Sequence, residues 1–211
     1  MRLYDIWAPV YDAFFGRVLS PGRQRALSLL ALSPGERLFI PGVGTGLDLP
    51  DVPAGVETFA IDISPGMLTK ARGRAGANTR VELMDAQRLR ISDACFDAVL
   101  CNLILSVVPD GTAAMREIWR VLRPSGRVAI FDKFIRPGIP VGRRRRLIGW
   151  VARVLGTHIN RRVDDILSDL PGLEIVSSEP SVLRGQYRVI LLRKAAEDCR
   201  TAPEVEPMLK P

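Results

Sequence analysis

The chain has 211 residues, of which 47% are hydrophobic, so it is long enough for a single α/β core and too short for two ordinary domains. Its formal net charge of +7 predicts attraction to polyanions, either nucleic acid or an anionic membrane face, and the charge alone does not choose between them. The three cysteines lack C-x-x-C spacing, which implies no metal site and favours buried thiols in a reducing cytosol.

Neither a membrane-spanning segment nor a signal peptide is predicted. The longest apolar stretch, 98–108, is about half of the roughly 20 residues that a spanning helix needs. Asp5 and Asp12 interrupt the apolar residues at the N-terminus, which disfavours a signal peptide. We therefore expect a cytoplasmic protein that is soluble, or peripheral to the inner face of the cell membrane at most.

The first third of the chain predicts helices ahead of the first strand. The apolar residues before position 20 lie at helical spacing, but Pro9 interrupts them, so two short amphipathic helices are expected. Ser20 and Pro21 predict the N-cap and first-turn proline of a further helix that ends near 33–35. Residues 1–33 would form a helical cap.

Strands and helices then alternate along the chain. Strands are predicted at 37–40, 58–62, 80–85, 96–102 and 126–132, with helices that open at Ser64-Pro65 and cover 111–122. Such alternation predicts a doubly wound, mostly parallel sheet whose ligands bind beyond the carboxyl ends of the strands.

The pattern changes after Asp132. A loop marked by proline and glycine leads into a basic segment at 142–155 and a polar helix at 162–170. Strands at 174–178 and 186–193 are close enough in sequence to pair antiparallel. We predict one domain over 1–194, with a basic amphipathic insertion at 139–170 and a mobile tail over 195–211.

A loop of alternating glycines, Gly42-Val43-Gly44-Thr45-Gly46, follows the first strand, and Asp62 ends the next one. Such a constellation is typical of nucleoside sites, because glycines admit a ligand close to the backbone and a carboxylate can accept both ribose hydroxyls. A dinucleotide site would have glycine at position 47, where this chain has leucine, so dinucleotide binding is disfavoured. An ordinary glycine turn is the alternative.

The G-x-G-x-G loop with Asp62 behind it resembles the S-adenosylmethionine site of class I methyltransferases. The resemblance implies a seven-stranded, Rossmann-like sheet, S-adenosylmethionine as cofactor and S-adenosylhomocysteine as product. It implies that the loop contacts the sulfur and amino acid end, that Asp62 binds ribose, and that Ile63 and Met67 pack on adenine. The residues it assigns to the cofactor are Gly42, Gly44, Thr45, Gly46, Asp62, Ile63, Met67, Asp85, Ala86, Asn102 and Leu103.

Asp85 is expected near the adenine amino group, and Asn102 and Leu103 are expected beside the reactive methyl. One position departs from the family pattern. Members usually carry an acid two residues before the first glycine, which helps to hold the cofactor's ammonium group, and this chain has Ile40 there. Loop carbonyls, or Tyr4 and Tyr11, are possible substitutes.

The N-terminal sequence from Tyr4 to Phe15 contains two Tyr-Asp pairs, and the glycine loop and Phe96-Asp97-Ala98-Val99 follow it along the chain. Together these segments resemble the bacterial soluble-type phosphatidylethanolamine N-methyltransferases. These are relatives of the quinone C-methyltransferases, which share those pairs. The resemblance implies methylation of the lipid amine toward phosphatidylcholine. Aromatic faces and phenol oxygens suit an amine that becomes cationic, so Tyr4 and Tyr11 are candidate catalytic residues and Trp7 a substrate contact. A stripe of core aromatics is the alternative.

A phospholipid headgroup also carries a phosphate, which a cation at the pocket rim would bind. The candidates are Lys133, Arg136, Arg184 and Arg188, although any single one could be a solvated charge. His158, the sole histidine, is a candidate acceptor for the amine proton or else a structural loop residue.

Wound as a helix, 142–155 has an apolar face opposite three arginines, Arg145, Arg146 and Arg153. This pattern predicts either an interfacial helix on anionic lipid or a lid packed on the domain. We expect a phospholipid in an anionic membrane surface as the partner, no nucleic acid and no obligate protein partner.

DNA methylation is disfavoured, and two other functions remain as alternatives. Amino-directed DNA methyltransferases usually have an Asn/Asp-Pro-Pro-aromatic motif after the fourth strand, where this chain reads Asn102-Leu-Ile-Leu105. A quinone or other small-molecule methyltransferase is the closer rival. A non-catalytic membrane-binding module with a degenerate cofactor fold is the second, and Ile40 favours it.

Overall fold

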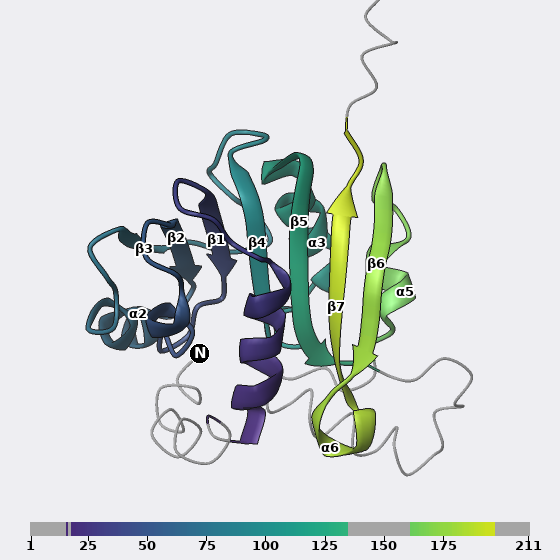
Figure 1. Ribbon diagram of the computed structural model, residues 1–211, viewed down its shortest axis with the longest axis horizontal. Helices are drawn as coiled ribbons and strands as arrows, with labels where there is room; N and C mark the ends of the chain where they lie inside the picture. Colours follow the sequence, from purple (N-terminus) through teal and green to yellow (C-terminus); the bar gives the residue numbers. More distant parts are fainter. Residues whose placement is uncertain (1–15, 17, 135–160, 197–211) are drawn as a thin grey trace, which may run out of the picture.

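The structure, a computed structural model, describes residues 16, 18–134 and 161–196. Its centre is a seven-stranded sheet in the order β3-β2-β1-β4-β5-β7-β6 (Figure 1). The strands are β1 Arg37–Pro41, β2 Glu57–Asp62, β3 Thr79–Leu83, β4 Phe96–Asn102, β5 Leu122–Lys133, β6 Leu173–Pro180 and β7 Tyr187–Lys194.

Strands β1 to β5 are parallel to one another, whereas β7 runs antiparallel to both β5 and β6. The predicted α/β fold with an antiparallel C-terminal pair is confirmed. Because β1 pairs with β2 on one side and β4 on the other, the strand order reverses at β1. The carboxyl ends of β1 and β4 therefore flank the crevice where a ligand of such a sheet binds.

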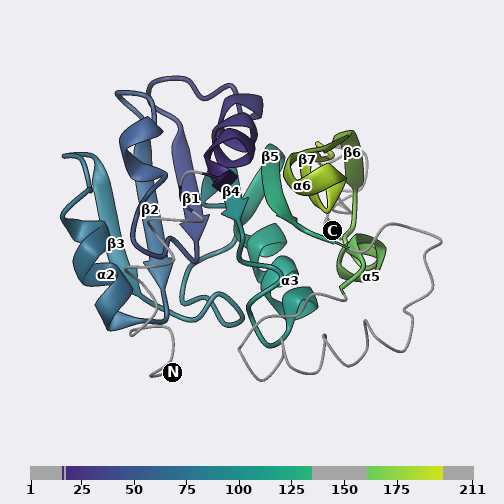
Figure 2. The ribbon, with the colours of Figure 1, turned by 90° about the horizontal axis from the view of Figure 1, so that it is seen from below.

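Alternating residues of the strands point to opposite faces of the sheet, and each face packs in its own hydrophobic layer. Leu38 and Ile40 pack with the helix over residues 18–29 and with α2 (Pro65–Arg72). Phe39 points the other way, to α3 (Gly111–Val121) and α5 (Val163–Leu167). Figure 2 shows the 18–29 helix and α3 on opposite faces of the sheet. Burial on both faces explains the near-continuous apolar runs of the central strands.

The prediction for the helix near residue 20 is wrong at both ends. The helix already includes 18–20, because Leu19 is fully buried against the sheet, so Ser20 lies inside it rather than at its N-cap. It ends at residue 29 instead of 33–35, because Ala31 has a φ of 44° and Arg127 donates to the carbonyls of Leu30 and Ala31. Arginine donors at a helix C-terminus satisfy carbonyls that have no partner within the helix.

Other boundaries shift less. β5 starts at Leu122, four residues before the predicted start, and its register with β4 is irregular between Phe96 and Ala98. The connection between β6 and β7 contains a short helix, α6 (Val182–Gly185). The 3-10 turn η1 (Leu49–Asp51) follows the glycine loop.

Several predicted features lie outside the described residues: the helices before residue 16, the basic segment 142–155, the tail from 197 onward, and Tyr4, Trp7, Tyr11, Arg136 and His158. The domain boundaries stay predictions. Across the described ranges, every helix is too short or too polar to cross a bilayer.

Candidate functional site

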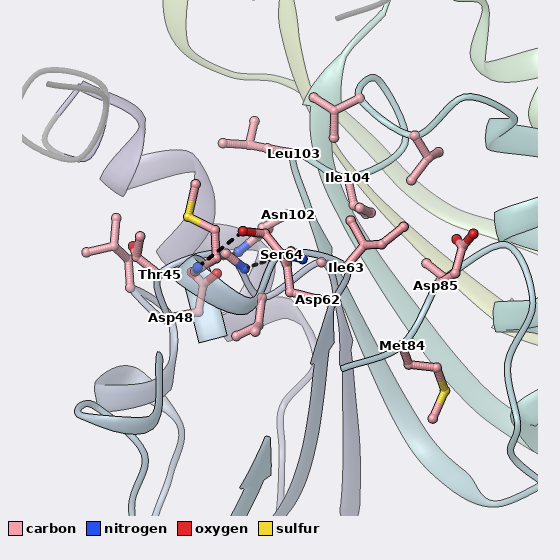
Figure 3. A pocket seen from close by; sticks show the side chains of 18 of the residues that line it. Thr45, Asp48, Asp62, Ile63, Ser64, Met84, Asp85, Asn102, Leu103 and Ile104 are labelled. Atoms are coloured by element: carbon pink, nitrogen blue, oxygen red, sulfur yellow. Dashed lines mark hydrogen bonds between the residues drawn. The ribbon is translucent and has the colours of Figure 1, made fainter. Parts of the chain in front are cut away.

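A pocket of about 570 Å³ lies at the carboxyl ends of β1, β2 and β4 (Figure 3). Its walls come from the glycine loop, the turn after β2, the loop after β3 and the segment after β4. Ten of the eleven residues assigned to the cofactor line it: Gly42, Gly44, Thr45, Asp62, Ile63, Met67, Asp85, Ala86, Asn102 and Leu103. Gly46 does not.

The three loop glycines serve different purposes. A Cβ on Gly42 would overlap the side chain of Ile104, and one on Gly46 would lie 2.8 Å from Cα of Ala71 in α2. Gly44 has a φ of +56° and nothing within 4 Å of the position a Cβ would take. Gly44 is therefore where bare backbone faces the pocket, while Gly46 packs the loop onto α2.

Asp62, at the end of β2, is held by backbone on both oxygens. Its Oδ2 accepts the N–H of Gly44 at 2.8 Å, and its Oδ1 accepts the N–H of Ser64 at 2.9 Å. Ser64 also caps α2 by accepting the N–H of Met67. Burial raises the pKa of Asp62, against the lowering effect of these N–H donors. A carboxylate so fixed keeps lone pairs for two ribose hydroxyls.

The adenine side of the pocket is expected at Asp85. Its Oδ1 accepts the Gln87 N–H at 2.9 Å and the Gln87 side-chain amide at 3.0 Å, so the carboxylate is fixed within one turn. Met84 is buried nearby, and Ile63 lines the pocket with half of its surface exposed. An acceptor beside apolar side chains suits a flat ring that carries an amino group.

At the other side of the pocket lies Asp48, which the sequence analysis missed. Asp48 Oδ1 accepts from Nε and Nη2 of Arg23, both at 2.8 Å, and from Nδ2 of Asn102 at 3.0 Å. All three side chains line the pocket. Figure 3 shows Asp48 and Asn102 on one side, Asp85 and Met84 on the other, and Asp62 between them. The only sequence signal for Asp48 was an acid two residues after the glycine loop, in a chain that has Ile40 where an acid was expected.

This arrangement fits an adenosyl sulfonium ligand. Asn102 Oδ1 is buried, and no described residue donates to it, so a ligand with a donor at that point would satisfy it. Acceptors at Asp62 and Asp85 suit ribose hydroxyls and an adenine amino group. Of the pocket-lining residues that the structure describes, Arg23 is the one cation, and it is paired with Asp48.

The wall beyond the expected methyl position is apolar and fixed from behind. Ile104, Val107 and Val108 line it, next to Leu103, whose φ of 60° is strained for a residue with a side chain. The segment 105–109 is held by Arg161, which donates to the carbonyls of Leu105, Val108 and Pro109. These apolar side chains exclude water from the region where a nucleophile would approach.

Asp132, the fully buried acid at the end of β5, holds the same segment. Its Oδ2 accepts the N–H of Ser106 at 2.9 Å, and its Oδ1 accepts the N–H of Lys133 at 2.7 Å. Burial raises the pKa of Asp132. Sequence analysis missed Asp132 and Arg161, because both act through partners that are distant in the chain.

Two of the four predicted substrate cations, Lys133 and Arg188, have side chains that the structure describes, and both lie outside the pocket lining. Lys133 lies outside the lining, and burial lowers its pKa. Arg188 also lies outside it and donates to the carbonyl and hydroxyl of Ser178 on β6, at 3.0 and 2.8 Å. The side chain of Arg184 and all of Arg136 lie outside the described part of the chain, so their roles stay predictions.

Comparison with known sequences gives consistent matches. A family model described as a methyltransferase domain matches residues 40–130. The phosphatidylethanolamine N-methyltransferase of Cereibacter sphaeroides is 36% identical over 198 residues, which cover 92% of this chain and 96% of that protein. The demethylmenaquinone methyltransferase of Deinococcus radiodurans is 36% identical over 177 residues, covering 78% of this chain and 70% of that protein.

Solved structures share the fold at lower identity. The [4+2]-cyclase SpnF superposes with a TM-score of 0.70 at 22% identity, covering 92% of this chain and 95% of that one. A methyltransferase from Thermotoga maritima superposes with a TM-score of 0.67 at 19% identity, covering 92% and 99%. These likenesses establish the architecture and leave the reaction to the site.

Proposed function

Because the chain belongs to the class I S-adenosylmethionine-dependent methyltransferases, we propose that it methylates the amine nitrogen of phosphatidylethanolamine and of its mono- and dimethylated forms. The observation that carries this proposal is the 36% identity to a phosphatidylethanolamine N-methyltransferase over nearly the full length of both chains. A lipid substrate would bring the protein to the inner face of the cell membrane, where its charge of +7 favours anionic lipid.

The pocket residues would hold the cofactor along the carboxyl ends of the strands. When bound, S-adenosylmethionine supplies an electrophilic methyl group on a sulfonium sulfur. Asp62 would accept the ribose hydroxyls, Ile63 and Met67 would contact adenine, and Asp85 would accept from its amino group. Gly44 lets the ligand approach the backbone closely.

The apolar segment after β4 would align the acceptor. Methyl transfer is an in-line displacement, so holding the nitrogen about 3 to 3.5 Å from the methyl carbon can contribute roughly 7 to 11 kcal/mol. Leu103, Ile104 and Val107 would shape this approach and keep water out. Tyr4, Tyr11 or His158 would take the amine proton, and Trp7 would contact the cationic methylated headgroup.

Cations near the carboxyl end of β5 and around β7 would bind the headgroup phosphate. Lys133, Arg136, Arg184 and Arg188 are the proposed cations, of which Lys133 directly follows the buried Asp132 at the end of β5. The basic segment 142–155 would contact anionic lipid, cover the pocket, or do both.

Vesicles with separate acceptors test the proposal. Protein and S-adenosylmethionine labelled in its methyl group are mixed with vesicles of phosphatidylethanolamine and an anionic lipid, and parallel vesicles contain a demethylated quinone. We expect label in the ethanolamine lipid, loss of label with Asp62→Ala, and little change with Asp51→Ala, an exposed acid outside the pocket lining. Label that appears only in the quinone would overturn the substrate assignment.

Carbon methylation of a quinone is the second candidate. The 36% identity to a demethylmenaquinone methyltransferase favours it, and the apolar wall after β4 would also accept a quinone ring. A quinone acceptor requires a base at the ring carbon, whereas an amine only has to lose its proton before attack. The product of the vesicle experiment separates the two.

A further inference from the structure

Three buried polar side chains meet at one end of the pocket, each from a different element. Arg23 comes from the 18–29 helix, Asp48 directly precedes η1, and Asn102 ends β4. They are 9%, 8% and 7% exposed, and all three line the pocket. Polar groups buried to this degree ordinarily have all their hydrogen bonds made.

The hydrogen bonds of this cluster fix which atoms remain available. A carboxylate only accepts, so the atom of Asn102 that lies 3.0 Å from Asp48 Oδ1 must be the amide nitrogen. Asn102 Oδ1 therefore points elsewhere, and it is buried without a donor among the described residues. Arg23 and Asn102 both donate to Oδ1 of Asp48, and within the described ranges no donor reaches its Oδ2.

The two acceptor atoms, Asp48 Oδ2 and Asn102 Oδ1, indicate which kind of ligand group would bind here. A group with several N–H donors would satisfy both Asp48 Oδ2 and Asn102 Oδ1, and an ammonium has three such donors. The ion pair of Arg23 and Asp48 carries no net charge, which suits a zwitterionic group that carries none either. Asp62 and Asp85 already account for the ribose and the adenine, so the amino acid end of the cofactor remains.

We propose that Asp48 and Asn102 bind the ammonium group of the cofactor's amino acid end, with Arg23 holding Asp48 in place. Asp48 thereby supplies the acid that is missing at Ile40, whose side chain is buried in the sheet. The inference rests on the cofactor of the proposed function and not on its methyl acceptor. Asp48 and Asn102 are binding residues in this proposal, and Arg23 is a positioning residue.

Calorimetry with paired ligands and no acceptor tests the proposal. S-adenosylhomocysteine carries the amino acid end, whereas 5′-methylthioadenosine keeps the adenosine and lacks that end. For Asp48→Asn we expect affinity for S-adenosylhomocysteine to fall about 10- to 100-fold, the loss typical of one charged hydrogen bond, with an unchanged affinity for 5′-methylthioadenosine. Asp51→Asn, an exposed acid three residues away, should bind both ligands as the wild type does.

The other possible binding results separate failure of the Asp48 proposal from failure of the proposed function. Equal losses for both ligands, or no loss for either, would overturn the role of Asp48. Failure of the wild-type protein to bind either ligand would instead contradict the proposed function. If Asp48→Asn does not fold, the wild type is titrated with the desamino analogue of S-adenosylhomocysteine, which must bind about 10- to 100-fold more weakly than the parent compound.

Arg23 is tested by graded substitution. Arg23→Lys keeps a positive charge beside Asp48, whereas Arg23→Ala leaves that carboxylate with Asn102 alone. We expect Arg23→Lys to retain more affinity for S-adenosylhomocysteine than Arg23→Ala, and both to bind 5′-methylthioadenosine normally. Equal affinity of the two variants for S-adenosylhomocysteine would overturn the positioning role.

Discussion

The two ends of the pocket are built in different ways. At the proposed adenosine end, Asp62 and Asp85 each accept an N–H from a residue two positions further along the chain, Ser64 and Gln87. At the opposite end, Asp48 is held by Arg23, 25 residues before it, and by Asn102, 54 residues after it. The adenosine end is thus largely a product of short sequence motifs, whereas the other end exists only when the 18–29 helix and β4 come together in the folded sheet.

The largest expected effect is at the locally built end. Asp62→Ala removes the proposed ribose acceptor and leaves the N–H groups of Gly44 and Ser64 without their partner. We expect affinity for S-adenosylhomocysteine and for 5′-methylthioadenosine to fall about 100-fold or more, since several hydrogen bonds to a charged group are lost. Calorimetry measures both ligands, with Asp51→Ala as the control. An unaltered affinity would show that the adenosine lies elsewhere.

A substitution in the 18–29 helix should disturb the Asp48 end of the pocket, because it changes how this helix packs on the sheet. A methyl group on Gly22 would overlap the ring of Phe131, which is fully buried in β5. We expect Gly22→Ala to lower the free energy of unfolding by about 1 to 3 kcal/mol, as overpacking does. Displacement of the adjacent Arg23 should also weaken S-adenosylhomocysteine more than 5′-methylthioadenosine.

Denaturant unfolding and calorimetry test this variant together. Ser28→Ala, an exposed change on the same helix, serves as the control and should leave both measurements as in the wild type. A Gly22→Ala protein of wild-type stability would mean that the helix is not seated against Phe131.

Arg161 holds the segment that carries the apolar wall of the pocket. Arg161→Ala leaves the carbonyls of Leu105, Val108 and Pro109 without their donor, at a cost of about 1 to 3 kcal/mol in stability. Because the acceptor side of the pocket is affected, KM for the lipid should rise while cofactor affinity changes little. Arg162→Ala removes the same charge at an exposed position and is the control. A loss confined to cofactor affinity would contradict this assignment.

The smallest expected effect near neutral pH is the change in cofactor affinity that follows from protonation of Asp62. Ribose hydroxyls donate to its ionised form, so acidification weakens binding once the carboxylate takes up a proton. Burial raises the pKa of Asp62, and the loss of affinity should therefore begin at a higher pH than an ordinary aspartate would give. Calorimetry between pH 4 and 8 measures it, and Asp62→Asn should abolish this component of the pH dependence.

Much of the fold could be predicted from sequence because its signals are local. β4 lies at the predicted 96–102, and α3 covers 111–121 of the predicted 111–122. Asp110 directly before α3 caps it by accepting two N–H groups, a contact between neighbours in the chain. The 18–29 helix was misplaced, because burial of Leu19 and donation from Arg127 set its two ends. Neither contact is visible without the tertiary structure.

The site residues that could be predicted from sequence also belong to local motifs, and the residues that were missed have partners far away in the chain. Asp62 and Gly44 were predicted from a loop and a strand end, and the structure brings them together at 2.8 Å. Asp48, Asp132 and Arg161 were missed because their partners lie 25 to 56 residues away. For Gly46, the sequence marks a glycine but not the reason for it, which is the approach of Ala71 rather than a ligand.

That approach of Gly46 to Ala71 has a consequence for turnover. The loop also donates from Val43 to the carbonyl of Ile61 at 2.8 Å, and Gly44 donates to Asp62, so the loop is tied to β2 by hydrogen bonds and to α2 by close packing. A nitrogen that is methylated repeatedly requires spent cofactor to be replaced after every round. We therefore expect this tightly packed wall to stay in place while the cofactor of the proposed reaction is exchanged.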